Sequence, residues 1–191
     1  NYIETRLSDG LHELKGGEAD TVLIAGMGGV LMVRILTEGT RALMGVRELV
    51  LQPQSEIDEV RRWLCTHGWH IMKEDILLDE GKYYPMFKAV PGETEGYTEA
   101  EYRFGKLGLQ ESPEVLADFL EKRLEVNRQI EAGLPKNDDG RIAARRAEVA
   151  AEIEQIGMLL RFGQRCDDQH VHAGGDGRGQ RRALNAHGGQ A

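Results

Sequence analysis

Residues 20–32 read DTVLIAGMGGVLM, and the order of apolar residues and glycines in this stretch decides the fold. Residues 21–25 are apolar or β-branched without a break, which predicts a strand buried on both faces. Gly26, Gly28 and Gly29 then let the backbone turn sharply. Apolar residues resume at helical spacing after the turn: Val30, Leu31, Ile35 and Leu36. The stretch therefore predicts a buried strand, a tight turn and an amphipathic helix.

The turn lies where open α/β sheets bind ligands, at the carboxyl end of a strand. Because they lack side chains, the glycines of this turn would let a flat ring or a phosphate approach the backbone closely. An ordinary tight turn between a strand and a helix would need the same glycines. Both interpretations fit this segment alone.

The strand and helix pattern repeats further along the chain. A second strand is expected at residues 48–51, followed by a helix that Ser55 caps and Gly68 ends. Two more strands, at residues 69–78 and 83–90, are joined by DEGK, which predicts an antiparallel hairpin. A strand, a helix, a strand and a helix in succession predict a parallel α/β sheet, and the hairpin would close it.

Three short segments follow expected strands and would meet at the carboxyl edge of the sheet: Asp9–Gly10, Gly26–Gly29 and Gln52–Gln54. Asp9, after a short strand expected at residues 2–7, would accept a hydrogen bond from an adenine amino group, and Gly10 would leave room for the ring. Alternatively, Asp9 caps a following helix. Gln52 and Gln54 would read the edge of a base, or the segment forms only a rigid turn.

After a polar connector, the apolar spacing predicts two antiparallel helices. They are separated by a glycine- and proline-containing break near residues 133–140, and the second has heptad-like apolar spacing over residues 149–160. The pair would serve either as a packing or dimerisation element or as a support for an RNA backbone. Residues 163–191 lack apolar periodicity, so they are expected to form a disordered or aberrant tail.

The composition limits the class of protein. The chain has 191 residues and a formal net charge of −8, which argues against a protein that coats nucleic acid with its whole surface. No run is long and apolar enough to cross a membrane, and a cytoplasmic protein is expected. Cys65 and Cys166 lack CxxC spacing, so neither a disulfide framework nor a metal site is predicted.

Several segments together resemble one family: RLSDGL from Arg6, EADTVLIAGMGGVLM from Glu18, LVLQPQS from Leu49, GW at Gly68, and DEGKYYPMFKA from Asp79. They are similar to the bacterial tRNA (adenine-N1)-methyltransferases that modify adenine 22 of the D-arm. AGMGG, QPQ and GKYY in this order are far more specific than one glycine motif. The resemblance runs from Arg6 to Leu160 and includes both expected helices.

The resemblance implies an α/β fold: a Rossmann-like class I methyltransferase sheet with a C-terminal α-helical coiled-coil hairpin. Asp9 and Gly10 would contact the adenine of the cofactor, S-adenosyl-L-methionine. The methyl group and the reacting adenine would meet at Gly26, Met27, Gly28 and Gly29. The base pocket would be lined by Gln52, Pro53, Gln54 and Tyr83. Packing of the strand explains Tyr83 equally well.

The same resemblance implies three regions. Residues 1–92 would form a partial Rossmann-like methyltransferase domain, residues 93–162 the connector and hairpin, and residues 163–191 the tail. The glycine motif for the methionine part of the cofactor and the acidic residue for its ribose would precede Asn1. The first strands of the sheet are therefore expected to be missing.

The implied activity is methyl transfer to N1 of adenine 22 in tRNA, with tRNA as the partner of a monomeric protein. N1 of neutral adenine carries a lone pair, so in-line attack on the sulfonium methyl needs alignment more than a strong base. Two alternatives remain: a non-catalytic RNA- or protein-binding module derived from a truncated methyltransferase, and a Rossmann-like enzyme with another nucleotide cofactor. The lack of GxGxxG or GKT motifs argues against the second alternative.

Overall fold

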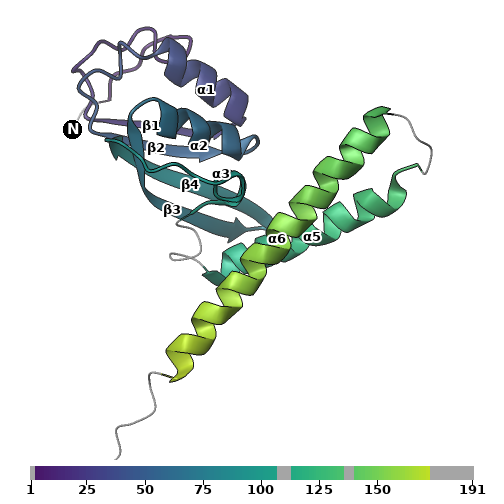
Figure 1. Ribbon diagram of the computed structural model, residues 1–191. Helices are drawn as coiled ribbons and strands as arrows, with labels where there is room; N and C mark the ends of the chain where they lie inside the picture. The colour runs from purple at the N-terminus through teal and green to yellow at the C-terminus, as the bar shows by residue number, and fades with distance from the viewer. Residues whose placement is uncertain (1–2, 107–112, 136–139, 173–191) are drawn as a thin grey trace, which may run out of the picture.

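The sheet begins with β1 (Thr21–Met27), the apolar strand that the sequence predicts, and β2 (Glu48–Pro53) runs parallel to it. β3 (Trp69–Asp79) and β4 (Lys82–Pro91) form the predicted antiparallel hairpin. β4 also pairs antiparallel with β2, which gives the order β1-β2-β4-β3 (Figure 1). The parallel pair and the hairpin are therefore confirmed.

The computed structural model describes residues 3–106, 113–135 and 140–172. Two helices, α1 (Gly29–Glu38) and α2 (Ile57–Thr66), cover the same face of the sheet (Figure 1). Both contribute to one core of buried apolar side chains, among them Met32, Leu36, Leu49, Leu51, Val60, Leu64 and Phe87. Apolar residues at helical spacing direct one face of each helix to the sheet, so burial of this face holds the two layers together.

The opposite face of the sheet carries exposed apolar side chains. Leu23 on β1 is 69% exposed, and Met72 and Leu77 on β3 are exposed as well. The prediction that residues 21–25 are buried on both faces is therefore wrong, because Thr21, Leu23 and Ala25 are all exposed. β1 lies at the edge of the sheet, and within the described residues only the face that carries Val22 and Ile24 is covered by helices.

The segment before β1 is not a strand. Residues 3–8 have no regular structure, so the strand predicted at residues 2–7 is wrong over the part that the structure describes. Ion pairs hold this segment instead, because Arg6 contacts both Glu4 and Glu18 at 2.6 Å. Solvent-exposed ion pairs contribute little to stability, so they hold this segment only weakly.

The C-terminal part is dominated by two long helices, α5 (Pro113–Gly133) and α6 (Gly140–His172), which pack side by side and project away from the sheet (Figure 1). The short helix α3 (Glu99–Phe104) lies between β4 and this pair. α6 continues past the boundary expected at residue 162, and residues 173–191 of the expected tail lie outside the described part. Within the described ranges, no helix is long and apolar enough to span a membrane.

Candidate active site at the carboxyl ends of β1 and β2

Two loops that follow neighbouring parallel strands are hydrogen-bonded to each other. The backbone N–H of Gln54 donates to the carbonyl oxygen of Met27 at 2.9 Å. The N–H of Gly29 donates to the carbonyl oxygen of Ser55, also at 2.9 Å. The predicted convergence of the Gly26–Gly29 and Gln52–Gln54 segments at one edge of the sheet is therefore observed.

The side chain of Gln52 strengthens this connection. Its Oε1 accepts a hydrogen bond from the backbone N–H of Gly26 at 2.9 Å, and its Nε2 donates to the carbonyl oxygen of Pro53 at 3.2 Å. These bonds use about half of the hydrogen-bonding capacity of an amide. Gln52 therefore positions the glycine turn, the Pro53 side chain is buried, and Gln54 is the glutamine of this segment whose side chain is exposed.

The glycines of this turn are needed for different physical reasons. A Cβ at Gly29 would lie 2.3 Å from the carbonyl oxygen of Glu56, and a Cβ at Gly28 would lie 2.9 Å from Oγ of Ser55. Close packing of the two loops therefore requires both. Gly26 has φ +76°, and a Cβ there would meet no described atom within 4 Å. The tight-turn interpretation thus explains Gly28 and Gly29, whereas Gly26 leaves open space beside the backbone.

The loop after β2 is strained where it enters α2. Glu56 has φ 42° and ψ 49°, a left-handed conformation that is unfavourable for a residue with a Cβ. Glu56 is the N-cap of α2, so the prediction that Ser55 caps this helix is wrong. Ser55 instead donates from Oγ to Oε2 of Glu56 at 2.5 Å, and its carbonyl oxygen accepts a hydrogen bond from the N–H of Gly29. Packing against the glycine turn displaces the cap by one residue.

The end of β1 and the first turn of α1 carry exposed apolar side chains, here called the apolar rim. Val30 is 64% exposed, and Met27 and Leu31 are exposed too. The sequence prediction placed Val30 and Leu31 on the buried face of the helix, and this is wrong. The buried residues of α1 are Met32, Ile35 and Leu36, together with Gly29. Exposed apolar side chains suit contact with a flat ring.

Asp9 and Gly10 lie along the flank of α1. Oδ1 of Asp9 is 3.5 Å from Nη2 of Arg34, past the first turn of the helix, and the Asp9 side chain is 73% exposed. Gly10 has φ +58°, and a Cβ there would lie 3.1 Å from the side chain of Ile35. The cap-like hydrogen bond in this turn belongs to Ser8, whose Oγ accepts from the N–H of Glu13 at 3.1 Å.

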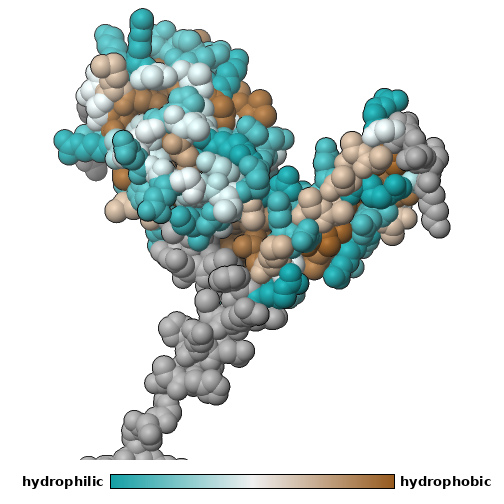
Figure 2. Space-filling view, in the orientation of Figure 1, coloured by the Kyte–Doolittle hydropathy of each residue, from teal (hydrophilic) through white to brown (hydrophobic). Residues whose placement is uncertain are grey.

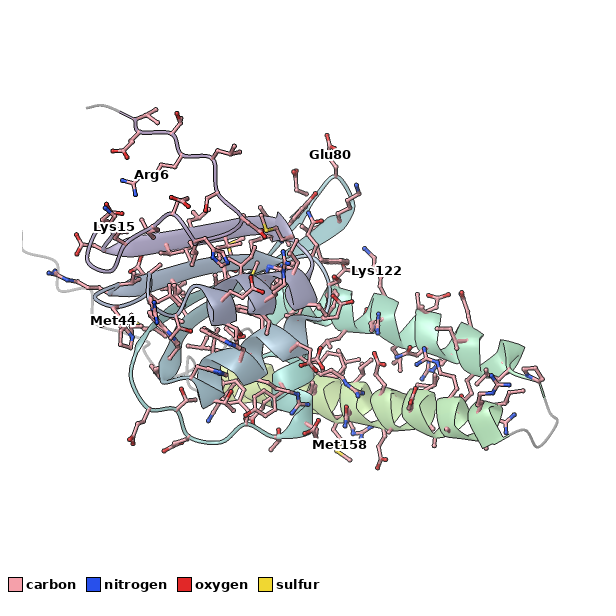
Figure 3. All side chains as sticks on the ribbon, turned by 90° about the horizontal axis from the view of Figure 1, so that it is seen from above. Arg6, Lys15, Met44, Glu80, Lys122 and Met158 are labelled. Carbon is pink, nitrogen blue, oxygen red and sulfur yellow. The ribbon has the colours of Figure 1, made fainter. Side chains whose placement is uncertain are left out.

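Tyr83 connects β4 to α5. Its hydroxyl donates to Oδ2 of Asp118, and its ring packs edge-on against Phe119 with centroids 5.2 Å apart. Lys122 Nζ lies 3.1 Å from the same carboxylate, and Figure 3 shows this side chain beside the hairpin whose turn carries Glu80. Hydrogen bonds from Tyr83 and then Lys122 lower the pKa of Asp118. These contacts support the packing interpretation of Tyr83.

A metal site does not emerge from this geometry. Among the described residues, no group of three or more His, Cys, Asp or Glu side chains could hold one ion. The groups that could contact a cofactor are the open backbone at Gly26, the apolar rim and the exposed carboxylate of Asp9.

The sequence profile described as tRNA (adenine(22)-N(1))-methyltransferase matches residues 1–158. The tRNA (adenine(22)-N(1))-methyltransferase of Bacillus subtilis (strain 168) is 40% identical over 93 residues, which are 49% of this chain and 39% of that protein. A relative from Mycoplasma pneumoniae, described as "Putative tRNA methyltransferase", matches over 36% of its length. The chain thus spans about two fifths of the length of these curated relatives.

The solved structures that resemble this chain include proteins described as tRNA methyltransferases. The crystal structure of the Bacillus subtilis M1A22 tRNA methyltransferase superposes with a TM-score of 0.74 at 29% identity, covering 81% of this chain and 69% of that one. A Streptococcus pneumoniae structure in complex with S-adenosyl-L-methionine has a TM-score of 0.67 at 33% identity, covering 81% of this chain and 67% of that one.

Proposed function

Because the chain belongs to the tRNA (adenine(22)-N(1))-methyltransferase family, we propose that it serves methyl transfer from S-adenosyl-L-methionine to N1 of adenine 22 in the D-arm of tRNA. The observation that carries the proposal is the pair of interlocked loops after β1 and β2, which leaves the backbone at Gly26 open. The cofactor assignment is supported by the related Streptococcus pneumoniae structure that contains it.

The residues at this edge fit a flat purine and a cofactor. Bound S-adenosyl-L-methionine would supply a sulfonium methyl, open to in-line attack by the lone pair of adenine N1. Gly26–Gly29 would hold the reacting groups together, because their backbone is fixed by Gln52 and by the loop after β2. Neutral N1 needs no strong base, so this fixed alignment would be the main contribution of the protein to the reaction.

Separate groups would recognise the base and the cofactor. Gln54, with its exposed amide, would read the edge of the adenine, while Gln52 and Pro53 support the loop from behind. The exposed carboxylate of Asp9 would accept a hydrogen bond from the amino group of the cofactor's adenine, and Gly10 lets this turn pack on α1. Met27 and Val30 would exclude water from the reacting atoms.

The regions would divide the work. Residues 1–92 would form the Rossmann-like class I part, and residues 93–162 would hold tRNA along a coiled-coil pair of helices. The protein would act as a cytoplasmic monomer. Lys and Arg side chains contact phosphates in a sequence-independent way, so this contact would fix the register of the RNA rather than select the base.

Two measurements test the proposal on the chain with the family's N-terminal cofactor-binding segment joined before Asn1. Calorimetric titration with S-adenosyl-L-methionine should show saturable binding, and primer extension on treated tRNA should stop at adenine 22. A tRNA with guanine at position 22 is the matched control and should give no new stop. Binding of tRNA without cofactor binding or methyl transfer would contradict the proposal and leave an RNA-binding module.

A further inference from the structure

A buried ion pair lies between α2 and β3, outside the two loops of the candidate site. Nε of Arg61 is 2.6 Å from Oε1 of Glu74, and the side chains are 5% and 2% exposed. The guanidinium also lies over the ring of Phe87, 4.8 Å from its centroid. Burying two charges costs free energy that the pair repays only with good geometry and further hydrogen bonds.

Those further bonds go to the connector that leads to the helical pair. Nη1 of Arg61 donates to the carbonyl oxygens of Tyr102 at 2.7 Å and Arg103 at 3.1 Å, at the end of α3. The backbone N–H of Lys106 donates to Oε2 of Glu74 at 2.9 Å. The two charged side chains therefore bind the connector from both sides of its turn.

The turn of the connector is shaped to this pair. Gly105 has φ +92°, and a Cβ there would lie 3.0 Å from both Nη2 of Arg61 and Oε2 of Glu74. The turn thus needs glycine for its backbone conformation and for close approach to the charges.

The connector in turn contacts the long helices. Phe104 packs in one buried cluster with Ile76 of β3, Leu116 and Leu120 of α5, and Ile156 of α6. Arg103 Nη1 also donates to Oε1 of Gln155 on α6 at 3.3 Å. The hydrogen bonds of the buried pair are therefore linked to the direction in which α5 and α6 leave the sheet.

Apart from the connector, Tyr83 of β4 also holds α5 to the sheet, through its hydrogen bond to Asp118 and its ring contact with Phe119. Figure 2 shows hydrophilic and hydrophobic side chains interspersed along the visible side of the helical pair. Its charged contacts include a pair between α5 and α6, Arg123 with Glu152 at 2.7 Å, and a pair within α6, Arg145 with Glu148 at 3.0 Å. Such pairs hold the two helices to each other or to themselves, and not to the sheet.

We infer that Arg61 and Glu74 are positioning residues for tRNA, because they fix the direction of α5 and α6 relative to the loops after β1 and β2. A tRNA that contacts both the helices and the loops is a ligand with two points of attachment. Affinity for such a ligand depends on the geometry between the two points, and a fixed geometry lowers the entropy cost of binding. This inference rests on the proposed function.

The test uses the R61M/E74L double variant, which removes both charges and keeps similar side-chain volumes. Spin labels are placed at the exposed positions Arg41 and Glu131 of the full chain, with Cys65 and Cys166 replaced by alanine. Pulsed electron spin resonance then measures the distance between the sheet side and the far end of α5. We expect a lower melting temperature, because the carbonyl oxygens of Tyr102 and Arg103 and the N–H of Lys106 lose these partners. We also expect a distance distribution about twice as wide.

Binding of tRNA and of cofactor is measured on the same variant. We expect the dissociation constant for tRNA to rise about tenfold, and that for S-adenosyl-L-methionine to stay within about twofold. The matched control is R62M/E99Q, because Arg62 and Glu99 also join α2 to α3 but lie at the surface. The control should leave the distance distribution and the tRNA affinity unchanged.

Three results overturn the inference or separate it from the proposed function. An unchanged distribution in a folded R61M/E74L variant overturns the positioning role. A widened distribution with unchanged tRNA affinity overturns its link to tRNA. If the parent chain binds no tRNA, the proposed function fails, while the distance measurement still decides whether the pair fixes the helices. If R61M/E74L does not fold, R61K is measured instead, since lysine keeps the charge but lacks the planar fork, and the same criteria apply.

Discussion

Replacing Gly29 with alanine tests whether the glycine turn is built for loop packing. The new Cβ would lie 2.3 Å from the carbonyl oxygen of Glu56 and 2.5 Å from that of Ser55. Both are backbone atoms, so no side chain can rotate away to relieve the contact. The two loops would have to separate, and the hydrogen bond from Gly29 N–H to the Ser55 carbonyl oxygen would be lost.

The size of the effect follows from these two losses. Overpacking of this kind costs about 1–3 kcal/mol, and the lost hydrogen bond adds about 1 kcal/mol. The G29A variant should therefore be less stable by about 2–4 kcal/mol. For a chain of this length, the melting temperature should fall by about 5–15 °C.

Gly26 provides the matched control, because a Cβ there would meet no described atom within 4 Å. The G26A variant retains only the cost of a left-handed conformation in a residue with a side chain, about 1–2 kcal/mol. Scanning calorimetry of both variants should give the larger loss of stability for G29A. By contrast, G26A should weaken cofactor or tRNA binding by more than its loss of stability explains. A G29A variant that melts no earlier than G26A would refute the packing argument.

Three further variants probe other contacts. E74Q should lose about 3–5 kcal/mol in urea denaturation, because it leaves the buried Arg61 charge without its carboxylate partner, and a loss below about 1 kcal/mol would contradict this. Q52A should lose about 0.5–1.5 kcal/mol of folding stability, because the N–H of Gly26 is left unpaired. Methyl transfer, measured as primer-extension stops, should fall by a larger proportion than the stability does. Equal proportional falls in stability and in methyl transfer would indicate that Gln52 has a purely structural role. Hydrogen bonds from Tyr83 and Lys122 hold the pKa of Asp118 below its ordinary value of 3.8. The stabilisation by ionised Asp118 is therefore complete above that value and is lost as pH falls through the lower folded pKa. D118N should accordingly be less stable than the parent at about pH 6, by a difference that shrinks as the pH falls below 3.8. A constant difference across this range would contradict the assignment.

The sequence predicted those parts of the fold that depend on local patterns. The apolar run of β1, the glycine turn and the DEGK hairpin follow from residue types and spacing within short windows. The exposure of Leu23 could not be predicted in this way, because burial depends on which elements cover each face of the sheet. The displaced cap at Glu56 depends equally on a contact with a distant loop, since Ser55 gives its carbonyl oxygen to Gly29.

Arg61 shows which signal the sequence did carry for the buried pair. It lies among Val60, Trp63 and Leu64, so a charged residue occupies a position next to the apolar face of α2. A long cationic side chain at such a place is either directed to solvent or paired with a buried carboxylate. The sequence could not identify Glu74 as the partner, because the pairing depends on how α2 packs on β3.

The two loops and the buried pair lead to one physical conclusion about the site. The side chains expected to read a base, Gln52 above all, are used in part to hold backbone in place, and the glycines permit that packing. The proposed methyl transfer needs an alignment of two reactants, for which fixed backbone is better suited than mobile side chains. Arg61 and Glu74 would extend the same principle to the substrate, since they hold the connector by its carbonyl and N–H groups. Loss of either support should therefore reduce the rate of methyl transfer more than it reduces affinity for the cofactor.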